Sequence, residues 1–179
     1  MTIELGVARG IDTLALGQPG QRTFRVRVLG AGTESVWLWV EKEHLRALAL
    51  AFRQLLAQLH YEHEPPIVGP GQFPEVAQHE VRVGLMAVGY NPSDRTLVLQ
   101  VSGLGIGEEE EPTLRVHLTL DHCASLAVHI DKIIAGGRPV CVLCGLPIDQ
   151  SGHVCIRSNG HSKEAMPDAR DDADADGDQ

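Results

Sequence analysis

One order of secondary-structure elements is predicted twice along this chain, and it restricts the fold more than any other feature. In residues 11–61, three short apolar or alternating segments precede a stretch whose large apolar residues recur at helical spacing. In residues 80–136, three alternating segments again precede a helical stripe, and two glycines follow it. Neither helix can bury its apolar face alone. The sequence therefore predicts an α+β fold, in which duplicated β-β-β-α units form an antiparallel sheet with two helices.

Short matching words support the duplication. Arg22-Thr-Phe24 in the first half corresponds to Arg95-Thr-Leu97 in the second half. At the start of each helix, Glu41 is aligned with Asp121, and Asp121 is the predicted N-cap of the second helix. This repetition predicts two halves related by a pseudo-twofold axis, joined by a proline-rich connector over residues 62–79.

The apolar segment over residues 36–40 is predicted to be a central strand, because both of its faces are apolar. Trp37 and Trp39 stand two residues apart within it. We interpret this pair as core packing rather than as a platform for a ligand.

Closely spaced cysteines near the end of the chain carry the strongest chemical signal. Cys141 and Cys144 stand two residues apart and are followed by Gly145, and the word His153-Val-Cys155 follows in the next loop. A CxxC turn lets two thiolates reach one ion, and a glycine after it lets backbone amides approach the sulfurs. This spacing predicts a zinc site.

Four ligands of this site are drawn from five candidates: Cys141, Cys144, His153, Cys155 and His161. If residues 153–155 are extended, the alternation of side chains puts His153 and Cys155 on one face. We therefore favour His153 with Cys155, and His161 is kept as the alternative ligand because Asn159-Gly160 can turn the chain back. Four protein ligands close a zinc site, which makes its predicted role structural, and no catalytic residue is predicted.

The composition and the first residues of the chain narrow the class of protein and its expected location. The chain has 179 residues and a net charge of −9, and its first residues lack the pattern of a signal peptide. No apolar run is long enough for a membrane span. We expect a cytoplasmic protein with reduced cysteines, organised as a duplicated domain over residues 1–136, a zinc-binding knuckle over 137–162 and a disordered acidic tail over 163–179.

These features favour a non-catalytic binding or adaptor module whose partner is another protein. One alternative is an enzyme, which would need an open zinc position or a pocket lined by His117, His122 or Arg115. Another alternative is a zinc ribbon that binds nucleic acid. The acidic body and an aromatic content of only 4% argue against that alternative.

Four segments give the chain a family resemblance: residues 18–24, 82–89, 135–147 and 152–160. Over about residues 11–161 it resembles a bacterial family known only as domain-of-unknown-function family 3090. In that family an aromatic residue often stands at the position of His161, which implies that His153 and Cys155 are the ligands.

The resemblance implies no established activity. Genes of the family often neighbour those for a histidine-phosphatase-like protein and a phosphoinositide-kinase-like protein. That neighbourhood implies a phosphate-related pathway as the setting of the enzyme alternative.

Overall fold

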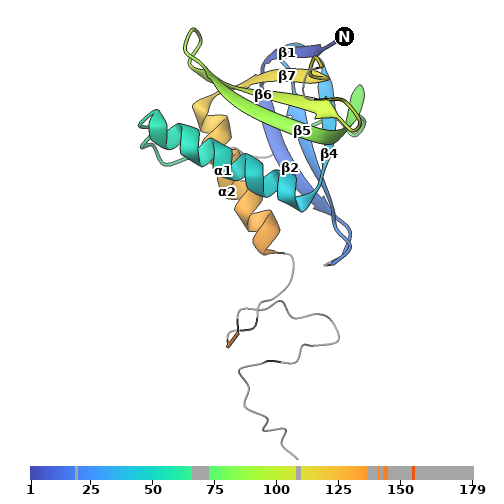
Figure 1. Ribbon diagram of the computed structural model, residues 1–179, viewed down its shortest axis with the longest axis vertical. Helices are drawn as coiled ribbons and strands as arrows, with labels where there is room; N and C mark the ends of the chain where they lie inside the picture. The colour runs from blue at the N-terminus through green and yellow to red at the C-terminus, as the bar shows by residue number, and fades with distance from the viewer. Residues whose placement is uncertain are drawn as a thin grey trace, which may run out of the picture. The chain divides into compact units, whose positions relative to one another are not determined.

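The computed structural model describes residues 1–18, 20–65, 73–107, 110–136, 141, 143, 144 and 155. The chain divides into two compact units, Met1–Arg138 and Pro139–Gln179. The regular elements that the structure describes lie in the first unit (Figure 1): β1 (Ile3–Val7), β2 (Gly10–Leu16), β3 (Thr23–Leu29), β4 (Ser35–Val40), α1 (Lys42–Gln58), β5 (His79–Asn91), β6 (Thr96–Gly103), β7 (Leu114–Leu118) and α2 (Leu120–Ala135). The predicted α+β class and its two helices are confirmed.

The seven strands form one mixed sheet in the order β1-β7-β6-β5-β4-β3-β2. Most neighbours are antiparallel, but β4 pairs with β5, and β1 with β7, in parallel. The prediction of an antiparallel sheet was therefore wrong at two places. The physical reason at β4 and β5 is the helix between them: α1 carries the chain back along the sheet, so that β5 starts at the same end as β4.

The sheet curls back on itself through its two edge strands. The edges β1 and β2 are consecutive in sequence, and only Ala8 and Arg9 separate them. The amide of Ala8 donates to the carbonyl of His117 on β7 at 2.8 Å, whereas the amide of Arg9 donates to that of Leu29 on β3 at 3.0 Å. Adjacent amides thus bond to strands near opposite ends of the sheet order, which brings the two edge strands together at Ala8 and Arg9. Strand β1 was not predicted from the sequence.

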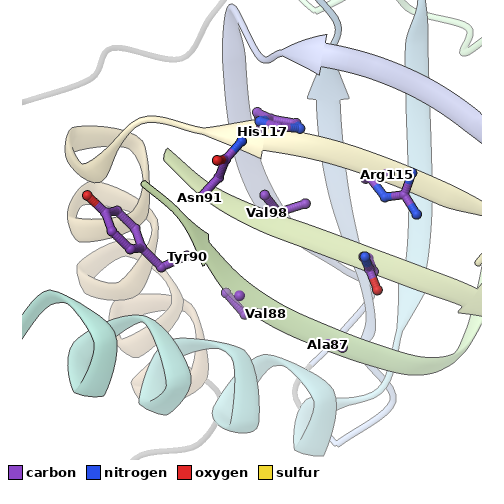
Figure 2. A pocket seen from close by; sticks show the side chains of 9 residues that line it. Ala87, Val88, Tyr90, Asn91, Val98, Arg115 and His117 are labelled. Carbon is purple, nitrogen blue, oxygen red and sulfur yellow. The ribbon is translucent and has the colours of Figure 1, made fainter. Parts of the chain in front are cut away.

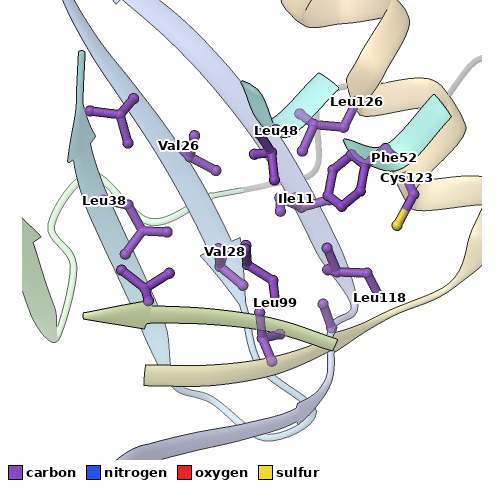
Figure 3. Close-up of a cluster of buried hydrophobic side chains, with 14 of the residues drawn as sticks. Ile11, Val26, Val28, Leu38, Leu48, Phe52, Leu99, Leu118, Cys123 and Leu126 are labelled. Carbon is purple, nitrogen blue, oxygen red and sulfur yellow. The ribbon is translucent and has the colours of Figure 1, made fainter. Parts of the chain in front are cut away.

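The two helices pack against each other and close the concave side of the sheet (Figure 1). The helix α1 contacts β5, and α2 contacts β2. Side chains from strands and helices meet in one buried core (Figure 3), which includes Val26, Leu38, Phe52, Leu99 and Leu126. Within the part of the chain that the structure describes, no helix is long and apolar enough to cross a membrane.

Strand register shows which positions of the two halves correspond. Phe24 on β3 faces Val40 on β4, and Leu97 on β6 faces Leu118 on β7. The residue after Val40 is Glu41, the N-cap of α1, and the residue after Leu118 is the N-cap of α2, Thr119. Glu41 therefore corresponds to Thr119 rather than to Asp121.

The predicted N-cap of the second helix was accordingly wrong by two residues. The hydroxyl of Thr119 accepts a hydrogen bond from the amide of His122 at 3.2 Å, and Asp121 lies in the first turn of α2. Threonine is a good N-cap because its hydroxyl satisfies an amide that has no partner in the helix. The carboxylate of Asp121 still suits the positive end of the helix dipole.

With this register, four buried positions of one helix correspond to four buried positions of the other. The pairs are Leu45 with Cys123, Leu48 with Leu126, Ala49 with Ala127, and Phe52 with Ile130. In the next pair, Arg53 of α1 forms an ion pair with Asp131 of α2 across the interface between the helices. The two helices thus contact each other through one pair of residues at corresponding positions.

The two tryptophans of β4 are not core residues. They alternate with buried Val36, Leu38 and Val40, and so they lie on the outer face of the sheet. The guanidinium carbon of Arg25, on β3, lies 3.8 Å from the ring centroid of Trp37 and 5.3 Å from that of Trp39. The expectation of core packing was wrong, because β4 buries one face only.

Candidate metal centre

Three cysteine sulfurs meet in the second unit of the chain. The Sγ atoms of Cys141, Cys144 and Cys155 all lie within 4.8 Å of one another. Cys141 is buried, and the other two are partly exposed. Two come from the CxxC turn and the third from a position fourteen residues after Cys141. The spacing in sequence therefore corresponds to proximity in space.

The distance between sulfurs suits a shared tetrahedral ion. The Sγ atoms of Cys141 and Cys155 are 3.7 Å apart. Two thiolates that bind one zinc ion at about 2.3 Å in a tetrahedron are separated by about 3.8 Å. A disulfide would bring the sulfurs to about 2.0 Å, and all four cysteines of the chain are free thiols. The three sulfurs therefore fit a metal ion better than a redox pair.

Backbone amides around Cys141 favour its charged form. Hydrogen bonds from the amides of Cys144 and Leu143 lower the pKa of the Cys141 thiol to about 6, and the side chains of Cys144 and Cys155 add smaller contributions. A thiolate is the form that binds a metal. The CxxC turn thus supplies two ligands and also the donors that keep one of them deprotonated.

Both histidines predicted as possible fourth ligands, His153 and His161, lie outside the described residues, as does Gly145. The predicted sites that the structure brings together are the three cysteines. The fourth ligand stays a prediction.

The fourth cysteine of the chain has a different role. Cys123 is fully buried on α2 (Figure 3), and burial raises its pKa far above the ordinary range. It fills the core position that corresponds to Leu45 in α1. Cys123 is therefore a small core residue.

A second group of polar residues lies on the outer face of the first unit. His117 and Arg115 line an open hollow of about 460 Å³ over β5, β6 and β7 (Figure 2). His122, the third residue suggested for a pocket, is not among the lining residues, and burial lowers its pKa. Asp94, in the turn before β6, and Thr96, the first residue of β6, both bond to His117 and were not predicted from the sequence. These two residues are far from His117 in the sequence, and only the fold brings them next to it.

The fold and the cysteine cluster together define a class of protein: a mixed α+β domain followed by a compact set of soft metal ligands. The chain belongs to the family described as Protein of unknown function (DUF3090), whose model matches residues 9–155. The resemblance found in the sequence is thereby confirmed. No curated protein matches the chain.

Proposed function

We propose that this protein is a zinc-binding protein in which Cys141, Cys144, His153 and Cys155 hold one structural zinc ion. The observation that carries the proposal is the meeting of three cysteine sulfurs within 4.8 Å. Three thiolates and one neutral imidazole form a common closed zinc set. Soft sulfur ligands in a tetrahedral arrangement favour zinc over magnesium or calcium, which prefer oxygen.

The choice of His153 over His161 rests on two supports. A short extended segment puts His153 and Cys155 on one face. The match to the family model includes His153 and ends at Cys155, before His161. The family comparison therefore supports a ligand inside the matched segment.

The role of the ion in this proposal is to stabilise a segment that is too small to form a core of its own. Structural zinc sites contribute roughly 10–16 kcal/mol of apparent binding free energy at neutral pH, and this free energy drives local folding. We infer that the ordered knuckle and the α+β domain form a non-catalytic binding module for another protein. A cytoplasmic location would keep the thiols reduced.

The repeating register supports a further part of the proposal, that the two halves descend from one duplicated β-β-β-α unit. The three strands of each half pair in the same order. Helix α1 contacts β5, the first strand of the second half, and α2 contacts β2, the first strand of the first half. Four buried positions of the two helices correspond.

The proposal is tested by metal content. Native mass spectrometry of the full chain should show one zinc ion per chain, and His153→Ala should lose it or weaken its binding by about 100-fold or more. His161→Ala should retain the ion. Cys123→Ala is the control among cysteines, because it removes a thiol that lies in the core, away from the cluster in sequence.

Two results would contradict the proposal. Zinc retained in Cys141→Ser would exclude the cluster as the site, and an iron or copper ion bound in preference to zinc would change the class of protein. Loss of zinc in His161→Ala but not in His153→Ala would keep the metal centre and exchange its fourth ligand.

A further inference from the structure

A hollow on the outer face of the sheet carries an inference that is independent of the metal centre. It is about 460 Å³ in volume and lies over β5, β6 and β7 (Figure 2). The side chains at its polar sides belong to Asn91, Gln100, Arg115 and His117. The volume falls in the range of small-molecule sites, roughly 300–1,000 Å³.

The hollow exists because small residues occupy one row of the sheet. Gly89 faces Val98, which in turn faces His117. A Cβ atom added to Gly89 would meet no other atom within 4 Å. In the first half the corresponding row is filled with larger side chains: Leu14, Arg25 and Trp39.

His117 is held in a fixed orientation at one side of the hollow. Its Nδ1 lies 2.8 Å from Oδ2 of Asp94, and the hydroxyl of Thr96 donates to the other oxygen of that carboxylate at 2.6 Å. In the protonated ring, Nδ1–H donates to this carboxylate and Nε2–H is left to donate to an anion. Arg95, between Asp94 and Thr96, has φ of 56°, a conformation that is uncommon for a residue with a side chain.

Arg115 provides a cation at another part of the lining. Its Nη1 donates to Oε1 of Glu4 at 2.5 Å, and no other described residue bonds to this guanidinium. A guanidinium carries five N–H donors in a planar fork, so most of them remain available. Arg115 is also partly exposed, with 36% of its side-chain surface accessible.

The amides of the lining add further donors. The side-chain oxygen of Asn91 accepts from the amide of Ser93 at 3.1 Å, which leaves the NH₂ group of Asn91 for a ligand. The residues that line the hollow include one arginine and one histidine but no acid. The two nearby carboxylates, Glu4 and Asp94, are already bonded to Arg115 and His117. The hollow thus offers mainly donors, next to an apolar floor.

We propose that this hollow binds a small organic anion, with its carboxylate or phosphate group between Arg115 and His117 and its apolar body against Gly89 and Val98. Arg115 supplies a planar, permanently charged fork that matches either kind of acid group. His117, in its protonated form, supplies an Nε2–H donor in an orientation fixed by Asp94. The floor of Gly89 and Val98 accepts an apolar chain or ring, which inorganic anions lack.

Binding is tested with simple probes on the full, zinc-loaded chain. Phenyl phosphate and phenylacetate carry the two kinds of acid group on the same ring, and phenol is the neutral control. Chemical shifts of backbone amides on β5, β6 and β7 should change with at least one of the two anions at millimolar concentration, and phenol should not change them. The ratio of the two affinities shows which acid group the site prefers.

Four variants separate a binding site from an adventitious surface. Arg115→Gln should weaken binding by at least about tenfold, since a charge-assisted bidentate contact is lost. Glu4→Gln should strengthen it, because the carboxylate that competes for Arg115 is removed. Gly89→Leu introduces the residue of the corresponding first-half position and should abolish binding by filling the hollow. Arg46→Gln removes a positive charge from α1 and should leave binding unchanged.

The fold of each variant is checked by its far-ultraviolet circular dichroism and its unfolding temperature. Equal binding of phenol, unchanged binding in Gly89→Leu, or the absence of shifts with both anions would overturn the proposal. None of these outcomes depends on the identity of the metal ligands.

Discussion

The two β-β-β-α halves have the same inner face and different outer faces. Inside, corresponding positions on the helices are apolar and buried, as in the pair Phe52 and Ile130. Outside, the row of Leu14, Arg25 and Trp39 in the first half is a filled surface with a cation on an aromatic ring. The corresponding row in the second half leaves a hollow: Gly89, Val98 and His117.

This difference shows which constraints the backbone imposes. The inner side chains of both halves share one core and must fill it at the same density, so the four helix pairs that are buried in both halves are apolar. The outer side chains face solvent, and substitutions there cost little unless they touch one another. Two halves with the same strand order can therefore keep one fold while one of the two outer faces is a surface with donors and free volume.

Truncation of the core should give the largest effect and should be similar in the two halves. Phe52 and Ile130 are both fully buried. We expect Phe52→Ala to lower the free energy of unfolding by about 3–5 kcal/mol and Ile130→Ala by about 2–5 kcal/mol, because each leaves a cavity. Urea titration followed by circular dichroism gives both values.

The shape of the urea unfolding transition tests whether the two halves share one core. One shared core should give a single transition with the same dependence on urea in both variants. A transition that splits into two steps in either variant would show that the halves unfold separately, contrary to a common core.

Ion pairs on the outer faces should give the next largest difference. Asp12 and Arg27 bond on the first half, with only 10% and 17% of their side-chain surface exposed. Arg27 also lies over the ring of Phe73, its guanidinium carbon 4.4 Å from the centroid. Asp12→Ala, which leaves this arginine without its carboxylate, should cost about 2 kcal/mol, between the values for buried and exposed pairs.

The exposed pair of the second half is the matched control. Glu4 and Arg115 have 52% and 36% of their side-chain surface exposed. Glu4→Ala should cost less than about 1 kcal/mol. Thermal unfolding of both variants at low and high salt measures the difference, and equal losses would mean that burial does not distinguish the two pairs.

Much of this fold could be predicted from the sequence, because strands and helices that face one core carry apolar residues at regular intervals. Alternation identified the strands β3, β6 and β7, and helical spacing identified both helices. Strand β1 was missed because its partner, β7, lies more than a hundred residues away and the pairing is parallel. The closing of the sheet depends on that long-range pairing, which no local pattern encodes.

The cysteine cluster and the hollow also differ in how far they could be predicted from the sequence. Three metal ligands lie within fifteen residues, and their spacing alone predicts that they meet. The hollow could not be predicted, because it depends on the register that places Gly89 beside Val98 and on a contact between Asp94 and His117 across 23 positions. A short motif is visible in sequence, whereas a surface assembled by register is visible only in the fold.

The contact at the predicted pseudo-twofold axis should give a smaller effect. Arg53 on α1 bonds to Asp131, the corresponding residue of α2, and both side chains are about half exposed. Arg53→Asp should cost roughly 0.2–1 kcal/mol plus the repulsion between two aspartates. The exchanged double variant, Arg53→Asp with Asp131→Arg, should recover most of the loss, because the axis makes the two positions nearly equivalent. A double variant no more stable than Arg53→Asp would argue against that symmetry.

The smallest expected effect is a pH dependence that belongs to the second half alone. A hydrogen bond from Thr96 and, to a lesser extent, His117 hold the pKa of Asp94 below its ordinary value. A carboxyl whose pKa is lowered by folding stabilises the folded state above its unfolded pKa, and this contribution is lost as the pH falls through the folded pKa. Asp94→Asn should therefore unfold at a slightly lower temperature than the wild type at neutral pH, and the difference should disappear in acid.

The first half offers a control for this titration. Gln21 precedes Arg22-Thr-Phe24 as Asp94 precedes Arg95-Thr-Leu97, and it cannot ionise. Gln21→Asn should shift the unfolding temperature by the same small amount at every pH. If the Asp94→Asn difference were also constant from neutral pH into acid, the charge of Asp94 would not be what holds His117 at the hollow. The two outer faces would then differ in shape but not in electrostatics.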